Sequence, residues 1–271
     1  MDRQSYDERL NARMEIAKSK NSRSKGRVTA FYLLFLLLIT AVCVTLALTV
    51  FFHIEKIEIV GASPYSEEEI MAVSNIKIGE NLFLAGTEDA KKRIEEKLPY
   101  IETAKIKRRL PSKISIDVTE AKESAAFKTE HDQYVIVSKN SKALSLKDDI
   151  PFGIALLEGF TLESHKIGQI VDFKNESDQK TLLDIINGFE KHRLEGVTRI
   201  SIENSVNLSA IFENRIMIKF GAPVDLDNKL VFAKEYISSS LSGNDTGVLD
   251  VTNPARGYYN PSKTFEGMVV K

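Results

Sequence analysis

The chain has 271 residues and a formal net charge of −1 at pH 7, but this charge is unevenly distributed. Residues 1–27 carry eight Lys and Arg against four Asp and Glu, whereas the rest carries 29 against 34, a formal charge of −5. An acidic main portion argues against a nucleic-acid-binding protein. The only cysteine is Cys43, which excludes a disulfide or a cysteine-based zinc site in the residues that follow it.

Residues 1–27 form a polar, basic tail without any strand-like run, which predicts little regular structure. Residues 28–52 contain no charged side chain. A helix of that length spans about 37 Å, enough to cross a hydrocarbon core of about 30 Å. A buried core helix is rarely apolar on every face, and a signal peptide has a shorter apolar run. We therefore expect one transmembrane helix, with the N-terminus cytoplasmic and the C-terminus extracellular because the basic flank precedes it.

Residues 53–121 predict a strand, two helices and two further strands. Alternating apolar and charged residues over 54–60 indicate a half-buried strand. Ser66 and Glu69 have the spacing of a capping box at the start of a helix. Residues 79–83 form a loop that returns apolar side chains to the core, and Thr87 is expected to cap a second helix that ends before Pro99.

The two strands that complete this module are also read from alternation. Ala104 and Ile106 share a face in the first, and the second has apolar residues at 114, 116 and 118. Residues 108–112, which include Pro111, form the turn between them.

The next segment, residues 122–256, predicts a mixed domain with an antiparallel-rich sheet. Two short paired strands are expected over 133–137 and 142–146, followed by strands over 154–160 and 168–172. A helix over 177–192 has an apolar stripe, and the strongest strand signals in the chain follow it. Those strands cover residues 197–203, 208–212 and 216–220, with a tight turn at 213–215, and precede a helix over 226–241 and a final strand over 247–252.

The first module resembles a POTRA domain, and the chain from Val28 to roughly Gly257 resembles the bacterial cell-division family DivIB/FtsQ. The motifs that carry the resemblance fall in the family's order: Ile59-Val60-Gly61, residues 79–83 (GENLF), Leu98-Pro99 and Arg109-Leu110-Pro111. POTRA domains also occur in outer-membrane insertases and secretion porins, but those proteins carry a long β-barrel, for which this chain has no room.

The resemblance implies an α+β protein with a basic cytoplasmic tail (1–27), a transmembrane helix (28–52), a POTRA domain (53–121), a β domain (122–256) and a C-terminal tail (257–271). It also implies a divisome scaffold at the septum of a dividing cell. Its expected partners are the bitopic division proteins FtsL and DivIC (or FtsB), together with the septal peptidoglycan synthase that they regulate.

Residues 247–262 resemble the terminal strand and tail through which FtsQ-type proteins meet their partners. Alternation predicts that Leu249 and Val251 face the core while the residues between and beside them face outward. Exposed aromatic residues are enriched at interfaces, although the two tyrosines could also pack the tail onto the domain. The candidate partner-binding residues are Val248, Asp250, Val251, Thr252, Tyr258 and Tyr259.

No constellation in the sequence indicates catalysis. The histidines after the span (His53, His131, His165 and His192) have no metal-ligand spacing, and no nucleophile elbow or phosphate-binding loop is present. The pair Asp225 and Asp227 is better explained by helix capping than by a calcium loop. We therefore expect a binding protein without cofactor or metal; the alternative is a membrane-anchored sensor or protein that binds cell-wall glycan.

Overall fold

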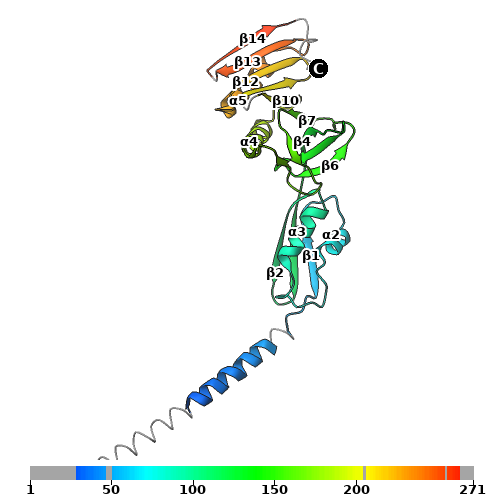
Figure 1. The fold of residues 1–271 in the computed structure, drawn as a ribbon, viewed down its shortest axis with the longest axis vertical. Helices are drawn as coiled ribbons and strands as arrows, with labels where there is room; N and C mark the ends of the chain where they lie inside the picture. Colours follow the sequence, from blue (N-terminus) through cyan, green and yellow to red (C-terminus); the bar gives the residue numbers. More distant parts are fainter. Residues whose placement is uncertain (1–28, 47–50, 204–205, 254, 263–271) are drawn as a thin grey trace, which may run out of the picture. The chain divides into compact units, whose positions relative to one another are not determined.

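The computed structural model describes residues 29–46, 51–203, 206–253 and 255–262, and it shows an α+β fold (Figure 1). The first described element is the helix Thr29–Leu46, which has a mean hydropathy of 2.4 and is not buried against the protein. Its length and composition make it a candidate membrane span of about 27 Å. The basic tail and residues 28 and 47–50 of the expected span lie outside the described residues.

The expected order of strand, two helices and two strands is confirmed. The elements are β1 (Lys56–Val60), α2 (Glu67–Ser74), α3 (Thr87–Lys97), β2 (Ile101–Arg109) and β3 (Lys113–Glu120). The three strands form one sheet in the order β1-β3-β2, so that β3 is central. Its residues Ile114 and Ile116 are fully buried, as a central strand beneath two helices requires.

The two helices of this module begin in different ways. At α2 the predicted capping box is confirmed: the Glu69 amide donates to Ser66 Oγ (3.2 Å), and the Ser66 amide donates to Glu69 Oε2 (2.8 Å). At α3 the expectation that Thr87 is the cap was wrong, because Thr87 already lies inside the helix. Gly86 occupies the cap position, and no side chain bonds the first turn.

The loop over residues 79–83 is confirmed, but it returns only part of its apolar surface to the core. Gly79 adopts φ +89°, a conformation that favours glycine. Leu82 is fully buried, whereas Phe83 stays nearly half exposed and stacks edge-on against Phe52 with ring centroids 5.2 Å apart.

A second sheet of nine strands follows, with two helices packed on it. Its elements are β4 (Glu123–Lys128), β5 (Tyr134–Ser138), β6 (Ala143–Lys147), β7 (Ala155–Glu158), β10 (Val197–Glu203), β11 (Asn207–Phe212), β12 (Ile216–Gly221), β13 (Gly247–Asn253) and β14 (Arg256–Pro261). The strand order is β14-β13-β12-β11-β10-β7-β4-β5-β6. The helices are α4 (Glu176–His192) and α5 (Leu226–Ser240), and a separate two-stranded ribbon pairs β8 (Leu162–Ser164) with β9 (Asp172–Phe173).

Most strand pairs in the large sheet are antiparallel, as predicted. The exceptions are β7 with both β4 and β10, and β12 with β13. Parallel neighbours need a crossover, and α5 is the crossover that returns the chain from β12 to β13. Between β11 and β12, the predicted tight turn is present, with Glu213 and Asn214 both at positive φ.

The short strands expected over 133–137, 142–146 and 154–160 are present as β5, β6 and β7, but two other short segments were predicted incorrectly. The strand β4 was not predicted, because its centre is two alanines and a phenylalanine rather than an alternating run. The strand expected over 168–172 is largely absent: Ile170 makes one isolated bridge with Lys142, and β9 begins only at Asp172.

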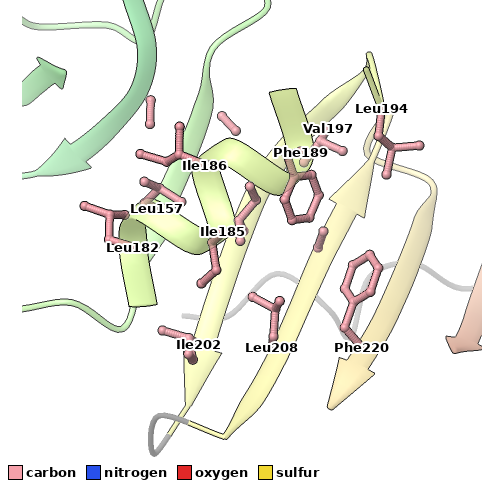
Figure 2. Packing of buried hydrophobic residues seen from close by; sticks show 14 of the residues in the cluster. Leu157, Leu182, Ile185, Ile186, Phe189, Leu194, Val197, Ile202, Leu208 and Phe220 are labelled. Carbon is pink, nitrogen blue, oxygen red and sulfur yellow. The ribbon is translucent and has the colours of Figure 1, made fainter. Parts of the chain in front are cut away.

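The core of the domain lies between the large sheet and its helices. The helix α4 directs its apolar side chains toward the strands that carry Ile202, Leu208 and Phe220 (Figure 2). These side chains are Leu182, Ile185, Ile186 and Phe189. The rings of Phe189 and Phe220 meet edge-to-face at 5.7 Å. One face of the sheet is therefore covered by helices.

The chain divides into two compact units. The first, called here the first unit, comprises the described residues up to Lys56 together with Lys77–Ala85 and Arg108–Ile114. The second unit holds the remaining residues, including the whole of the large sheet.

Candidate partner-binding surface

The strand β13, which carries four of the six candidate residues, is not the last strand of the sheet. It pairs in parallel with β12 on one side and antiparallel with β14 on the other. The sequence predicted a tail from residue 257 onward, but β14 continues the sheet to Pro261. This prediction was wrong because Gly, Asn and Pro residues give β14 no strand-like sequence pattern. Its pairing with β13 stabilises a strand that its composition alone does not favour.

The register of β13 and β14 sorts the six candidates onto two faces. Directly paired residues share a face, and Asp250 pairs with Tyr258 while Leu249 pairs with Tyr259. Alternation then places Val248, Asp250, Thr252 and Tyr258 on the face away from the helices. Val251 and Tyr259 belong to the helix-covered face together with the fully buried Leu249.

On the helix-covered face, Val251 is fully buried and Tyr259 is partly buried. The Tyr259 hydroxyl donates a hydrogen bond to the Thr246 carbonyl at 2.9 Å, and its ring lies 6.2 Å from that of Tyr236 on α5. Burial, with the nearby charge of Asp245, raises the pKa of Tyr259 above 10.0. These contacts fasten β14 to the domain.

The opposite face, called here the open face, is formed by two rows of side chains that cross four strands. Pairing builds a polar row from Tyr258, Asp250, Lys219 and Ser209. It builds a second row from Asn260, Val248, Met217 and Ile211. All eight are partly or fully exposed, and Tyr258 is 65% exposed.

The polar row is held in a defined geometry. Thr252 donates two hydrogen bonds to Asp250 Oδ1, from its amide at 3.0 Å and from its hydroxyl at 2.7 Å. The carboxylate of Asp250 is thereby fixed between Tyr258 and Lys219. A shallow hollow lined by Ser209, Met217 and Thr252 continues this face toward β11. The surface can offer an aromatic ring, an oriented acceptor and a cation to a partner.

Sequence reasoning missed the contribution of β11 and β12 to this face. Met217 and Lys219 alternate with the apolar Ile216, Ile218 and Phe220, but nothing in the sequence indicates that β12 lies beside β13. The signal that could have found them is the helix between the two strands, since a strand–helix–strand unit commonly places its strands in parallel contact.

The edge of the sheet next to the open face is formed by β14. Among the described residues, β14 is the end of the strand order, so one side of its backbone has no neighbouring strand there. Two glycines allow β14 to pack closely against α5 and β13. A Cβ on Gly257 would come within 2.2 Å of the Phe232 ring, and a Cβ on Gly247 would come within 2.3 Å of the Asn260 carbonyl oxygen. An edge of this kind can accept a strand from another chain.

Charged side chains elsewhere in the described residues form local pairs. In the described part of the chain, no group of three or more His, Cys, Asp or Glu side chains could hold a metal ion. His192 lies 2.6 Å from Asp227, which also pairs with Lys191 at 2.7 Å, and both partners lower the pKa of that carboxyl below 3.8. Asp225 occupies the N-cap position of α5, as predicted, but its side chain makes no capping hydrogen bond and instead accepts from Asn228 Nδ2 at 2.7 Å.

Comparison with known proteins agrees with the architecture. Residues 52–121 match the POTRA domain of FtsQ type. The chain is 30% identical over 241 residues to the cell division protein DivIB of Clostridium botulinum, covering 83% of this chain and 93% of that protein. It is 27% identical over 222 residues to DivIB of Clostridium acetobutylicum (81% and 87%), and 26% identical over 167 residues to the cell division protein FtsQ of Syntrophotalea carbinolica (59% and 56%). With a POTRA domain, a mostly antiparallel second sheet and this extent of similarity, the chain belongs to the DivIB/FtsQ family of bacterial cell-division proteins.

Proposed function

We propose that this cell-division protein is a membrane-anchored scaffold without catalytic activity, and that it binds other bitopic division proteins outside the membrane. Its N-terminal tail is cytoplasmic and the residues after the span are extracellular, because the basic flank precedes the span. The proposed partners are FtsL-type and DivIC/FtsB-type proteins, and the complex helps to assemble or regulate septal peptidoglycan synthesis.

The observation that carries this proposal is the combination of an edge strand with an exposed aromatic residue beside it. The β14 edge can pair with a strand of the partner through backbone hydrogen bonds, which supply affinity with little dependence on side chains. Tyr258, Asp250 and Val248 on the open face then supply specificity, since aromatic residues dominate the energetics of many interfaces. Val251 and Tyr259 support this surface from within the domain.

The test is the affinity of the detergent-solubilised full chain for the outer segments of FtsL-type and DivIC-type proteins. We expect Tyr258→Asp to weaken binding by tenfold or more, corresponding to about 1.4 kcal/mol. Phe152→Asp is the matched control, because Phe152 is also an exposed aromatic residue but lies in a turn outside the sheet.

Both variants change exposed side chains, so both should unfold at the denaturant concentration of the wild type. Equal affinity for the Tyr258→Asp variant and the wild type would contradict a binding surface at β13 and β14. Binding of purified peptidoglycan without binding of either protein would instead favour the cell-wall-binding alternative.

A further inference from the structure

Beyond the described helix Thr29–Leu46, the first unit exposes several large apolar side chains. Five of these side chains are between 46% and 77% exposed: Phe51, Ile78, Phe83, Leu84 and Leu110. Single exposed apolar residues are ordinary on a protein surface, but several on one small unit indicate a contact. These five side chains, called here the seating surface, come from three segments of the chain: residues 51–54, 77–85 and 108–112.

Backbone hydrogen bonds fasten the first two segments together. The Leu82 amide donates to the Phe52 carbonyl at 2.8 Å, and the Gly79 amide donates to the Ile54 carbonyl at 2.7 Å. His53 forms an isolated antiparallel bridge with Asn81. The loop that carries Ile78, Phe83 and Leu84 is therefore an extension of the residues that directly follow the span.

The third segment is tied to the same loop by Arg108. Its guanidinium donates to the Leu82 carbonyl from Nε (2.8 Å) and to the Ala85 carbonyl from Nη2 (2.9 Å). Ser112 is bonded to Glu55 twice, through its carbonyl and through its hydroxyl, each at 2.8 Å. The turn that carries Leu110 is thus held to the other two segments.

Covalent connection limits how far this unit can lie from the membrane. Phe52 stands six positions after Leu46, the end of the described helix. A fully extended chain of six residues spans roughly 20 Å, and any shorter path brings Phe52 closer. The loop bonded to Phe52 is therefore held within reach of the bilayer surface whatever direction the chain takes.

The charge of the three segments is opposite to that of the portion of the chain to which they belong. Residues 51–56, 77–85 and 108–114 carry five Lys and Arg against two Glu, a formal charge of +3, whereas residues 28–271 carry −5. Basic side chains close to a bilayer are attracted by anionic headgroups, and apolar side chains next to them can enter the boundary with the acyl chains.

We propose that the seating surface rests on the outer leaflet of the membrane, with Phe51, Ile78, Phe83, Leu84 and Leu110 at the level of the headgroups. Lys77, Arg109 and Lys113 contact anionic lipid phosphates around them. The proposal rests on the helix spanning the membrane but does not depend on the partner-binding surface. The span alone would only tether the protein, whereas this second contact limits its rotation and tilt above the bilayer.

Because the sequence contains no tryptophan, a single introduced tryptophan reports on its own surroundings without background emission from other tryptophans. A Leu84→Trp variant carries one tryptophan, at a side chain that is 77% exposed and therefore tolerant of the change. The full-length variant is placed in nanodiscs whose lipids carry bromine on the acyl chains, which quenches tryptophan on contact. We expect the emission to shift to shorter wavelength and most of it to be lost relative to nanodiscs of unbrominated lipid.

The control is Phe152→Trp, which places the single tryptophan at a fully exposed position of the second unit. We expect unshifted emission without quenching. Co-elution of each variant with the nanodisc verifies that the span is inserted, so failure of anchoring is recognised separately. Emission from Leu84→Trp that bromine leaves unchanged in an inserted sample would overturn the proposal, as would equal quenching of both variants.

The lipid charge is tested with the same reporter. Nanodiscs with phosphatidylglycerol should quench Leu84→Trp more strongly than nanodiscs of phosphatidylcholine alone, and adding Lys77→Glu with Arg109→Glu should remove that difference. Equal quenching in both lipids would support apolar contact and overturn the role of the basic side chains. Emission of Leu84→Trp that responds to an added division protein but never to bromine would assign the surface to a protein partner instead.

Discussion

Neighbouring residues of β13 differ sharply in burial. Leu249 is fully buried against the helix-covered core, while its neighbour Val248 lies on the open face and is partly exposed. The two side chains are adjacent in sequence and similar in size, so a comparison between them tests the assignment of faces directly.

We expect Leu249→Ala to lower the free energy of unfolding by about 2–5 kcal/mol, because it leaves a cavity in a packed core. Val248→Ala removes a partly exposed side chain and should cost less than about 1 kcal/mol. Chemical denaturation of both variants measures the difference. Similar losses for the two would show that the assignment of faces is incorrect.

Lys142 is a second residue whose position determines its chemistry. Its ammonium group is buried and donates to the carbonyl oxygen of Ile101 at 2.5 Å. Burial lowers the pKa of Lys142 below 10.5, opposed by the charges of Glu102 and Glu95. The folded protein therefore loses this proton at lower pH than the unfolded chain does.

This difference predicts a pH dependence of stability with a definite sign. Between the lowered pKa of the folded state and 10.5, the unfolded state binds more protons, so the free energy of unfolding rises with pH there. The difference in stability between the wild type and a Lys142→Met variant should increase in favour of the wild type across that alkaline range. Denaturant titrations of both proteins at several pH values measure it, and a constant difference would contradict the prediction.

At the scale of elements, β14 depends on close approach to α5. Gly257 lies where an added Cβ would fall 2.2 Å from the Phe232 ring, which in turn stacks on Tyr236 at 6.1 Å. The strand can occupy the edge of the sheet only while this position lacks a side chain.

We expect Gly257→Val to displace β14 and expose the outer side of β13. Hydrogen exchange of the β13 amides should then accelerate, and binding to division proteins should weaken. Gly243→Ala is the matched control, because no atom lies within 4 Å of the Cβ that it adds. Unchanged exchange in Gly257→Val would mean that β14 tolerates the side chain and is less tightly fixed than its packing indicates.

At the scale of the whole molecule, the proposed orientation across the membrane can be tested by cysteine labelling, because Cys43 is the only cysteine in the sequence. In a Cys43→Ala background we expect a membrane-impermeant maleimide to label Phe152→Cys in intact cells but not Ser5→Cys. Labelling of Ser5→Cys after permeabilisation verifies that the thiol is reactive. The reverse pattern would contradict a cytoplasmic N-terminus.

Much of this fold follows from local sequence. Period-2 alternation located β10, β12 and β13 to within a residue, and the capping box located the start of α2, because these features are decided by residues close together in the chain. The error at Thr87 arose because a residue type that suits a cap does not determine at which residue the helix begins: Gly86 is the cap, and Thr87 already belongs to α3.

The sequence by itself determined the apolar span, the acidic portion after it, the order of elements in residues 53–121 and the inward direction of Leu249 and Val251. Only the tertiary structure decided that β14 is the edge, that Tyr258 and Tyr259 lie on opposite faces, and that Met217 and Lys219 join Val248 and Asp250. The physical reason is that the hydrogen bonds and side-chain contacts of a strand are made with neighbouring strands. Register and pairing depend on residues distant in the chain, whereas apolarity and alternation belong to the strand alone.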